Sequence, residues 1–179
     1  MNPVDDGQSD RQIQETVKRL GLSDESKRRQ ARRELEIAGK KAVPILIAAL
    51  FHGNSIARRE AAEILVTIKD AATAPALVCT LEDEDHDARW AASKALIALD
   101  QEGLEPLLLA LMVDFTSVHL REGTRHVLKT LKNASCLENP LLEVLKALEG
   151  LQPTATVPWA AEKAWEELYG PGKKVKKSK

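Results

Sequence analysis

Aromatic residues are scarce in this chain of 179 residues, of which only 3% are Phe, Trp or Tyr. A hydrophobic core must therefore be built from Ala, Leu, Ile and Val, because apolar residues still make up 44% of the chain. Ala and Leu favour helices, whereas strands prefer β-branched and aromatic residues. The composition thus predicts a soluble, globular and mainly helical protein rather than a disordered one.

Cysteine and long apolar runs are also rare. Cys79 and Cys136 are the only cysteines and neither belongs to a CxxC motif, so a disulfide framework is excluded. The longest apolar run, residues 42–51, has ten residues and is too short to span a bilayer. The first ten residues are polar and acidic and lack the features of a signal peptide. We therefore expect a cytoplasmic protein without a membrane span.

The chain has almost no net charge, because 27 acidic residues balance 26 basic ones and leave −1 at pH 7. Such a balance does not favour nucleic acid or an anionic membrane as a partner. The motifs GxSxG and GxGxxG and the P-loop are absent as well. We expect no catalytic residue, no cofactor and no metal site, and predict that the protein is not an enzyme.

What the sequence does contain is a repeat of about 31 residues. A proline followed two residues later by leucine occurs four times, at Pro44, Pro75, Pro106 and Pro140. An arginine followed seven residues later by leucine forms a second series, at Arg28, Arg58, Arg89 and Arg121. Two markers with nearly the same period, in phase, indicate a repeated structural unit.

Each unit is predicted to contain two helices. Helix A begins near the arginine and has apolar residues at helical spacing. Helix B begins with the proline, which is tolerated in a first turn because that position has no backbone hydrogen bond to lose. The predicted pairs cover residues 24–53, 55–83, 86–114 and 117–149.

Further segments lie outside the four pairs. A helix over residues 9–20 and a last helix over residues 158–169 would cap the two ends, and a Pro/Thr linker over residues 152–157 would precede the second cap. We expect one domain over residues 9–169, a disordered N-terminus over residues 1–8 and a disordered basic tail over residues 170–179.

This pattern resembles the HEAT repeat, and specifically the short type named after phycobilisome lyase subunits. The resemblance rests on residues 56–65 followed by Ala-Pro-Ala-Leu at 74–77, recurs over residues 88–108, and covers about residues 24–150. The sequence departs from the family at Gly39, where Asp is usual, and at Gly123-Thr124, where Ala-Ala is usual. The resemblance implies an all-α fold, an α-α superhelix of about four helix pairs with helix B on the concave side, and a binding or scaffolding role.

The helix-B groove can be located from helical geometry. If Leu46, Leu77 and Leu108 point to the core, the opposite face comes two and about five to six residues later. That rule selects two series at intervals of 31 residues: Ala48, Cys79 and Ala110, and then His52, Asp83 and Asp114. They are flanked by Phe51, Glu82 and Val113. We predict that the six selected residues bind a protein or peptide partner, and that the acidic side of the groove favours a basic one.

Two alternative functions remain open. Residues 11–41 contain ten basic against five acidic residues and the segment after residue 170 contains five lysines, so these parts are candidates for nucleic-acid binding. The acidic groove argues against it. The resemblance also implies a phycobilin-lyase-like accessory subunit, although no residue specifies a bilin.

Other polar residues have both a functional and a structural interpretation. The arginine series is a candidate anion track, but we expect these arginines to bond the turn residues Asp70 or Asp100. The acidic run 82–87 resembles part of a Ca²⁺ loop, but it lacks the Gly and distal Glu of an EF-hand, so we expect it to cap the next helix.

A possible metal pair and one tryptophan also have two interpretations. Glu122 and His126 have the spacing of a metal pair, although a solvated helix face explains them better. Trp90 is either an exposed anchor for a partner or a cover for apolar surface between neighbouring A helices.

Overall fold

Helices form most of the computed structural model, which describes residues 3–134 and 137–171. The α-helices in these ranges are α1 (Pro3–Lys18), α2 (Glu25–Ala38), α3 (Val43–His52), α4 (Ser55–Ile68), α5 (Ala74–Thr80), α6 (His86–Leu99), α7 (Leu104–Val113), α8 (Val118–Asn133), α9 (Asn139–Glu149) and α10 (Pro153–Tyr169). Four short 3-10 turns connect them: η1 (Arg19–Gly21), η2 (Gly39–Ala42), η3 (Ala71–Thr73) and η4 (Asp100–Gly103). The all-α fold class is therefore confirmed.

The helices predicted as A and B start in different ways. The A helices α2, α4, α6 and α8 each follow a polar residue whose side chain accepts a hydrogen bond from a backbone N–H of the first turn: Asp24, Asn54, Asp85 and Ser117. The B helices α3, α5 and α7 instead follow directly from 3-10 turns and have a proline in their first turn. Local sequence therefore sets where both kinds of helix begin.

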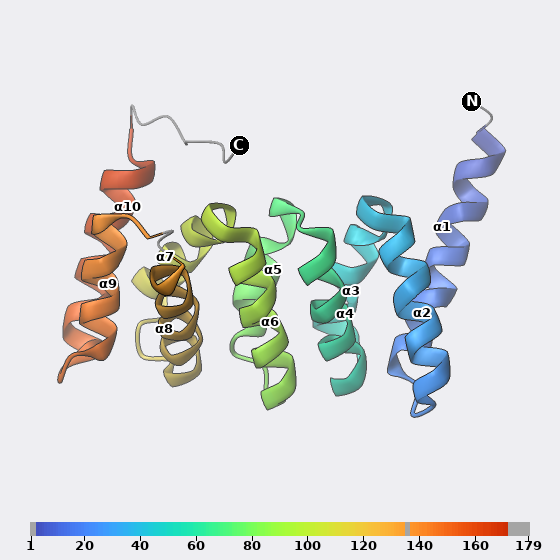
Figure 1. Cartoon of the computed structure of the whole chain (residues 1–179), viewed down its shortest axis with the longest axis horizontal. Coiled ribbons are helices and arrows are strands. Elements are labelled where there is room, and N and C mark those ends of the chain that lie inside the picture. The colour runs from blue at the N-terminus through green and yellow to red at the C-terminus, as the bar shows by residue number, and fades with distance from the viewer. Residues whose placement is uncertain (1–2, 135–136, 172–179) are drawn as a thin grey trace.

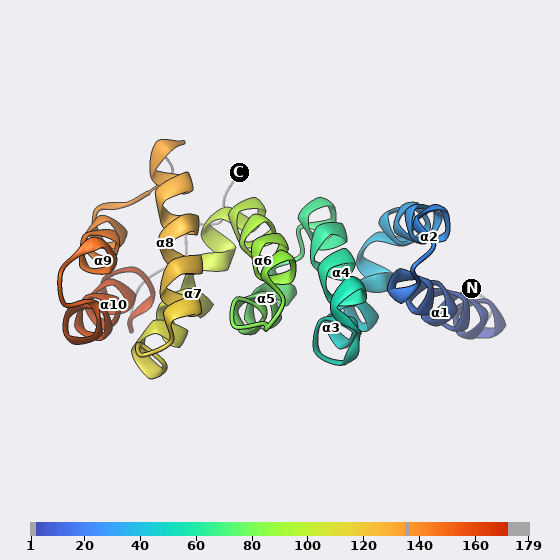
Figure 2. The same ribbon diagram turned by 90° about the horizontal axis from the view of Figure 1, so that it is seen from below.

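The helices are arranged in two adjacent rows (Figures 1 and 2). One row, which we name the A row, contains α2, α4, α6, α8 and α9, and each of these helices packs against the next. The other, the B row, contains α1, α3, α5, α7 and α10, again with each helix packed against the next. Stacked helix pairs of this kind form an α-α solenoid.

Leucines of both rows fill the core. Leu46, Leu77 and Leu108 of the B row are at most 1% exposed, so the predicted orientation of these helices is confirmed. The leucines that follow the arginine series are equally buried: Leu35, Leu65, Leu96 and Leu128. Buried side chains between residues 13 and 164 belong to a single cluster, so the rows share one core along their length.

The fourth unit differs from the prediction. We expected the segment that forms α9 to be the B helix beside α7, but α10 packs against α7 and α9 packs beside α8. Leu142, at the leucine position after Pro140, is only half-buried, whereas Leu141 is fully buried. α9 therefore lies in the A row, and α10 occupies the place beside α7 in the B row, with a buried face that includes Val157 and Ala161.

Two segments predicted to lack regular structure are helical. Most of the expected linker, residues 152–157, belongs to α10, which continues through Pro158. An interior proline removes one backbone hydrogen bond, and the burial of residues on either side, Val157 and Ala160, offsets this loss. α1 begins at Pro3, within the segment expected to be disordered, because a proline and acidic residues favour a helix N-terminus.

Residues 1–2 and 172–179 lie outside the described residues, and so does most of the predicted basic tail. Among the helices that are described, none is long and apolar enough to cross a lipid bilayer.

Candidate functional site

The six predicted residues all lie along the B row, but in different surroundings. Ala48 and His52 line a pocket of about 430 Å³ between α1 and α3. Cys79 and Asp83 line a second pocket of about 340 Å³ between α3 and α5. Ala110 is half-buried against the core and Asp114 is exposed just beyond α7. The two pockets thus contain four of the six residues, two in each.

The α1–α3 pocket is mainly apolar. Val17, Ile45 and Ala48 contribute to its wall, and Lys18 is the one residue of its lining with a permanent charge. The amide of Asn54, also in the wall, donates to the carbonyl of Gly21 at 2.9 Å and accepts from a backbone N–H of its own helix. The side chain of Asn54 therefore joins η1 to the start of α4.

The α3–α5 pocket combines an exposed ring with acidic side chains. Phe51, which is 52% exposed, lines it together with Cys79, Arg58 and the acidic residues 82–84. Arg58 donates through Nε to Oδ2 of Asp83 at 2.6 Å and through Nη2 to Oδ1 at 2.8 Å. This two-point ion pair joins the start of α4 to the loop after α5.

Asp83 is part of the protein framework rather than a free carboxylate. Its side chain is only 8% exposed. Burial by itself would raise the pKa of Asp83, but hydrogen bonds from Arg58 and from the backbone N–H of Asp85 outweigh it, so the pKa lies below its ordinary value. The same ion pair raises the pKa of Arg58. The exposed acidic groups of this pocket are therefore Glu82 and Glu84.

The arginine series has a structural role. The four arginines donate to carbonyls of the loop before their own helix, five or six residues earlier: Arg28 to Leu22 and Ser23, Arg58 to Gly53, Arg89 to Asp83 and Glu84, and Arg121 to Phe115. The predicted partners Asp70 and Asp100 were wrong. An arginine in the first turn points back toward the helix N-terminus, where the loop carbonyls are within reach.

The acidic run 82–87 caps the next helix and pairs with arginines of α4. Asp85 accepts a hydrogen bond from the backbone N–H of Ala88 at 2.9 Å and so caps α6, as predicted. Asp87 lies 3.6 Å from a guanidinium nitrogen of Arg59. Within the described ranges, no three His, Cys, Asp or Glu side chains lie together as a metal ion would require.

Trp90 and His126 contact each other across the A row. Their ring centroids are 4.5 Å apart, so Trp90 covers surface between α6 and α8 while remaining 48% exposed. Burial, helped by the nearby charge of Arg125, lowers the pKa of His126. His126, which has the spacing of a metal pair with Glu122, therefore packs against the ring of Trp90.

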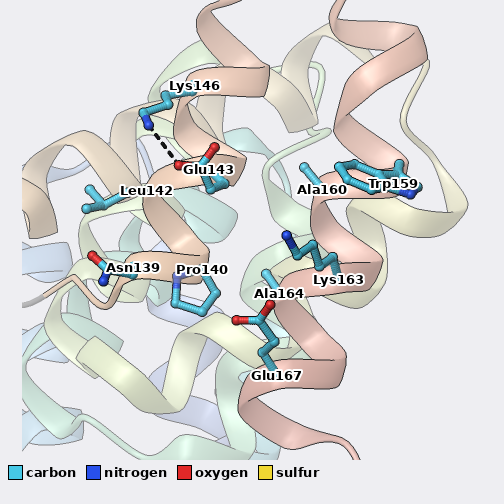
Figure 3. A pocket seen from close by; sticks show the side chains of 10 residues that line it. All are labelled: Asn139, Pro140, Leu142, Glu143, Lys146, Trp159, Ala160, Lys163, Ala164 and Glu167. Carbon is cyan, nitrogen blue, oxygen red and sulfur yellow. Dashed lines mark hydrogen bonds and ion pairs between the residues drawn. The ribbon is translucent and has the colours of Figure 1, made fainter.

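A third pocket, of about 380 Å³, lies between α9 and α10 (Figure 3). Lys146 donates to Glu143 at 2.7 Å on α9, which lowers the pKa of Glu143. On α10, the ammonium group of Lys163 lies 5.6 Å from the centroid of the Trp159 ring. Nothing in the sequence indicated this pocket, because α9 was expected in the B row and not in the A row beside α10.

Much of the positive charge of the N-terminal third is already paired. The buried carboxylate of Glu60 accepts hydrogen bonds from Arg32 and, at 3.2 Å, from Arg59. Arg19 pairs with Glu34, whose pKa is lowered mainly by that hydrogen bond. These contacts tie neighbouring helices together.

Comparison with known protein families supports the repeat interpretation. Residues 13–97 match the family described as HEAT repeats, over a segment that runs from α1 into α6. Such repeats generally serve as protein-interaction scaffolds, and no enzyme family was found. The match is to HEAT repeats in general and does not single out the phycobilisome-lyase type. No curated protein sequence matches the chain significantly.

Proposed function

We propose that this solenoid, whose residues 13–97 are HEAT repeats, is a non-enzymatic scaffold that holds a protein or peptide partner along the B row. The observation that carries the proposal is a set of exposed apolar side chains on the B helices. Phe51 of α3 is 52% exposed, and Leu109 and Val113 of α7 are 42% and 83% exposed. Exposed apolar side chains that recur along one row of helices support an interaction surface on that row.

Small side chains between these groups support the same proposal. Ala48 and Cys79 are exposed on α3 and α5, at equivalent positions 31 residues apart. Because their side chains are short, a partner can approach the helix backbones closely between the larger groups. Phe51 would then provide an aromatic contact of the kind that often dominates binding energy.

Ion pairing in the N-terminal third favours a protein partner over nucleic acid. Arg32 and Arg59 are bound to Glu60, and Lys40 lies 3.4 Å from a carboxylate oxygen of Asp70. Phosphate binding would have to break these pairs, since it depends on lysines and arginines that are free to replace counterions.

Crosslinking in the native host followed by affinity purification tests the B row. The variant combines Ala48→Glu with Val113→Asp, both at exposed positions, so that folding is preserved. Ile37→Asp is the matched control, because Ile37 is 87% exposed on α2 in the A row. We expect capture of the partner to fall at least about tenfold in the double variant, since a charge facing an apolar contact costs more than 1.4 kcal/mol.

Circular dichroism must first show that both variants keep the helical content of the wild type. A folded double variant that captures the same partners at the wild-type level would contradict the assignment of the B row. Loss of capture by Ile37→Asp alone would move the binding surface to the A row.

A further inference from the structure

Three equivalent positions of the B row alternate in character. Phe51, Glu82 and Val113 follow one another at intervals of 31 residues. Phe51 and Val113 lie at the ends of α3 and α7, and Glu82 lies in the turn just after α5. All three are exposed, and the outer two are apolar while the middle one is acidic. A partner lying along the row therefore meets an apolar, an acidic and again an apolar group.

The middle position has negative charge that the protein does not neutralise. The α3–α5 pocket contains three carboxylates, Glu82, Asp83 and Glu84, and one cation, Arg58. Arg58 is held by Asp83 and by the carbonyl of Gly53, and its contact with Glu84, at 3.3 Å, is the longest of these. In the described part of the chain, the carboxylate of Glu82 forms neither an ion pair nor a hydrogen bond.

The two other pockets described above differ from it in charge. The α9–α10 pocket contains two lysines and two glutamates, so its charges balance. The α1–α3 pocket contains Lys18 and no carboxylate. Among these three pockets, the α3–α5 pocket alone is complementary to a cation.

The spacing along the row matches a helical partner. Adjacent packed helices lie about 8–10 Å apart. An α-helix rises about 10.5 Å in seven residues and returns to nearly the same face after these two turns. Side chains at heptad intervals on a partner helix would therefore meet successive B helices in register.

We propose that the B row binds an α-helix of a partner protein that presents a Lys or Arg midway between two apolar residues at heptad spacing. The cation lies against Glu82 with its aliphatic part near the half-exposed Phe51 ring, and the apolar residues contact Phe51 and Val113. This inference rests on the proposed function and specifies the chemistry of the partner.

A displayed library of helical peptides tests the proposal directly. The probe is a 21-residue Ala/Gln-based helix randomised at three positions seven residues apart, selected against the full-length protein. We expect enrichment of apolar–Lys/Arg–apolar sequences. In a selected peptide, replacement of the central cation by Gln should weaken binding about threefold, as expected for one partly exposed ion pair.

Charge reversal on the protein provides the decisive comparison. Selection against Glu82→Lys should favour Asp or Glu at the central position, and the original peptides should bind this variant about tenfold more weakly. Glu122→Lys, an exposed glutamate of α8 in the A row, is the matched control and should change neither result. Binding of the original peptides should also weaken as salt is raised.

The possible failures are distinguishable. The inference would be overturned if the selected peptides showed no preference at the central position, or if Glu82→Lys left that preference unchanged. The proposed function would still stand in that case if Val113→Asp abolished binding of the same peptides. Absence of any enrichment, or selected peptides that no B-row variant affects, would overturn both.

Discussion

Replacement of Asp83 by Asn tests whether this carboxylate holds the fold together or contacts a partner. Asp83 is 8% exposed and its partner Arg58 is 14% exposed, and two hydrogen bonds of 2.6 and 2.8 Å join them. Removing one member of a buried ion pair costs about 3–5 kcal/mol. Asn keeps one carbonyl acceptor for Arg58, so we expect a loss of roughly 2–3 kcal/mol.

Urea unfolding at pH 7, followed by circular dichroism, measures this loss. For a chain of this size the free energy of unfolding falls by about 2 kcal/mol per molar urea, so the midpoint should drop by roughly 1–1.5 M with an unchanged slope. Glu84→Gln is the matched control, because Glu84 contacts the same arginine but its side chain is 87% exposed. Its effect should stay below about 0.5 kcal/mol.

The pH dependence of the same experiment gives an independent check. The pKa of Asp83 is lower in the folded protein than its unfolded value of about 3.9. Its stabilising contribution is therefore complete above that value and is lost as the pH falls through the folded pKa. The difference between wild type and Asp83→Asn should shrink in acid. A difference below about 0.5 kcal/mol at pH 7, with partner capture lost instead, would refute the structural role.

Four further substitutions test backbone geometry and buried charge. Gly39→Ala should destabilise the protein by about 1 kcal/mol, because φ is +58° at this position, although no atom lies within 4 Å of the added Cβ. Asp100→Gly, at φ +53°, should stabilise the protein by about the same amount. Urea midpoints that shift in the same direction for both variants would contradict this reasoning. Glu60→Ala should cost about 2–3 kcal/mol by leaving Arg32 without its partner, and a melting temperature equal to wild type would show the pair to be neutral. Pro158→Ala should raise the melting temperature, corresponding to about 1 kcal/mol, by restoring a backbone hydrogen bond in α10; a lower melting temperature would mean that the helix needs the proline.

Part of the candidate site could be derived from spacing. Placing Leu46 in the core was enough to locate Ala48 on the opposite, exposed side of α3, because the helical period fixes the angle between the two side chains. The 31-residue repeat then locates Cys79 at the same position of α5. The same rule could not reveal that Asp83 is bound by Arg58, which lies 25 residues earlier in the chain. It also gave no sign that the charge of Glu82 is left unneutralised.

The fourth unit shows where sequence spacing stops being informative. Pro140 and Leu142 continue the repeat pattern, yet α9 packs beside α8 and α10 takes the place beside α7. The reason lies in contacts between distant residues: the indole N–H of Trp165 reaches the carboxylate of Glu105, 60 residues away, at 3.4 Å. No local pattern encodes which of two helices fits a given position better.

The sequence by itself determined the helices and their buried faces. A cap such as Asp24, a first-turn proline such as Pro44 and the burial of Leu35 depend on residues within one or two turns, so they can be derived without a structure. The tertiary structure alone decided which helices became neighbours, which charges were neutralised and where pockets opened. These properties depend on the fit between surfaces far apart in the chain, and the α3–α5 pocket with its unpaired Glu82 is their result.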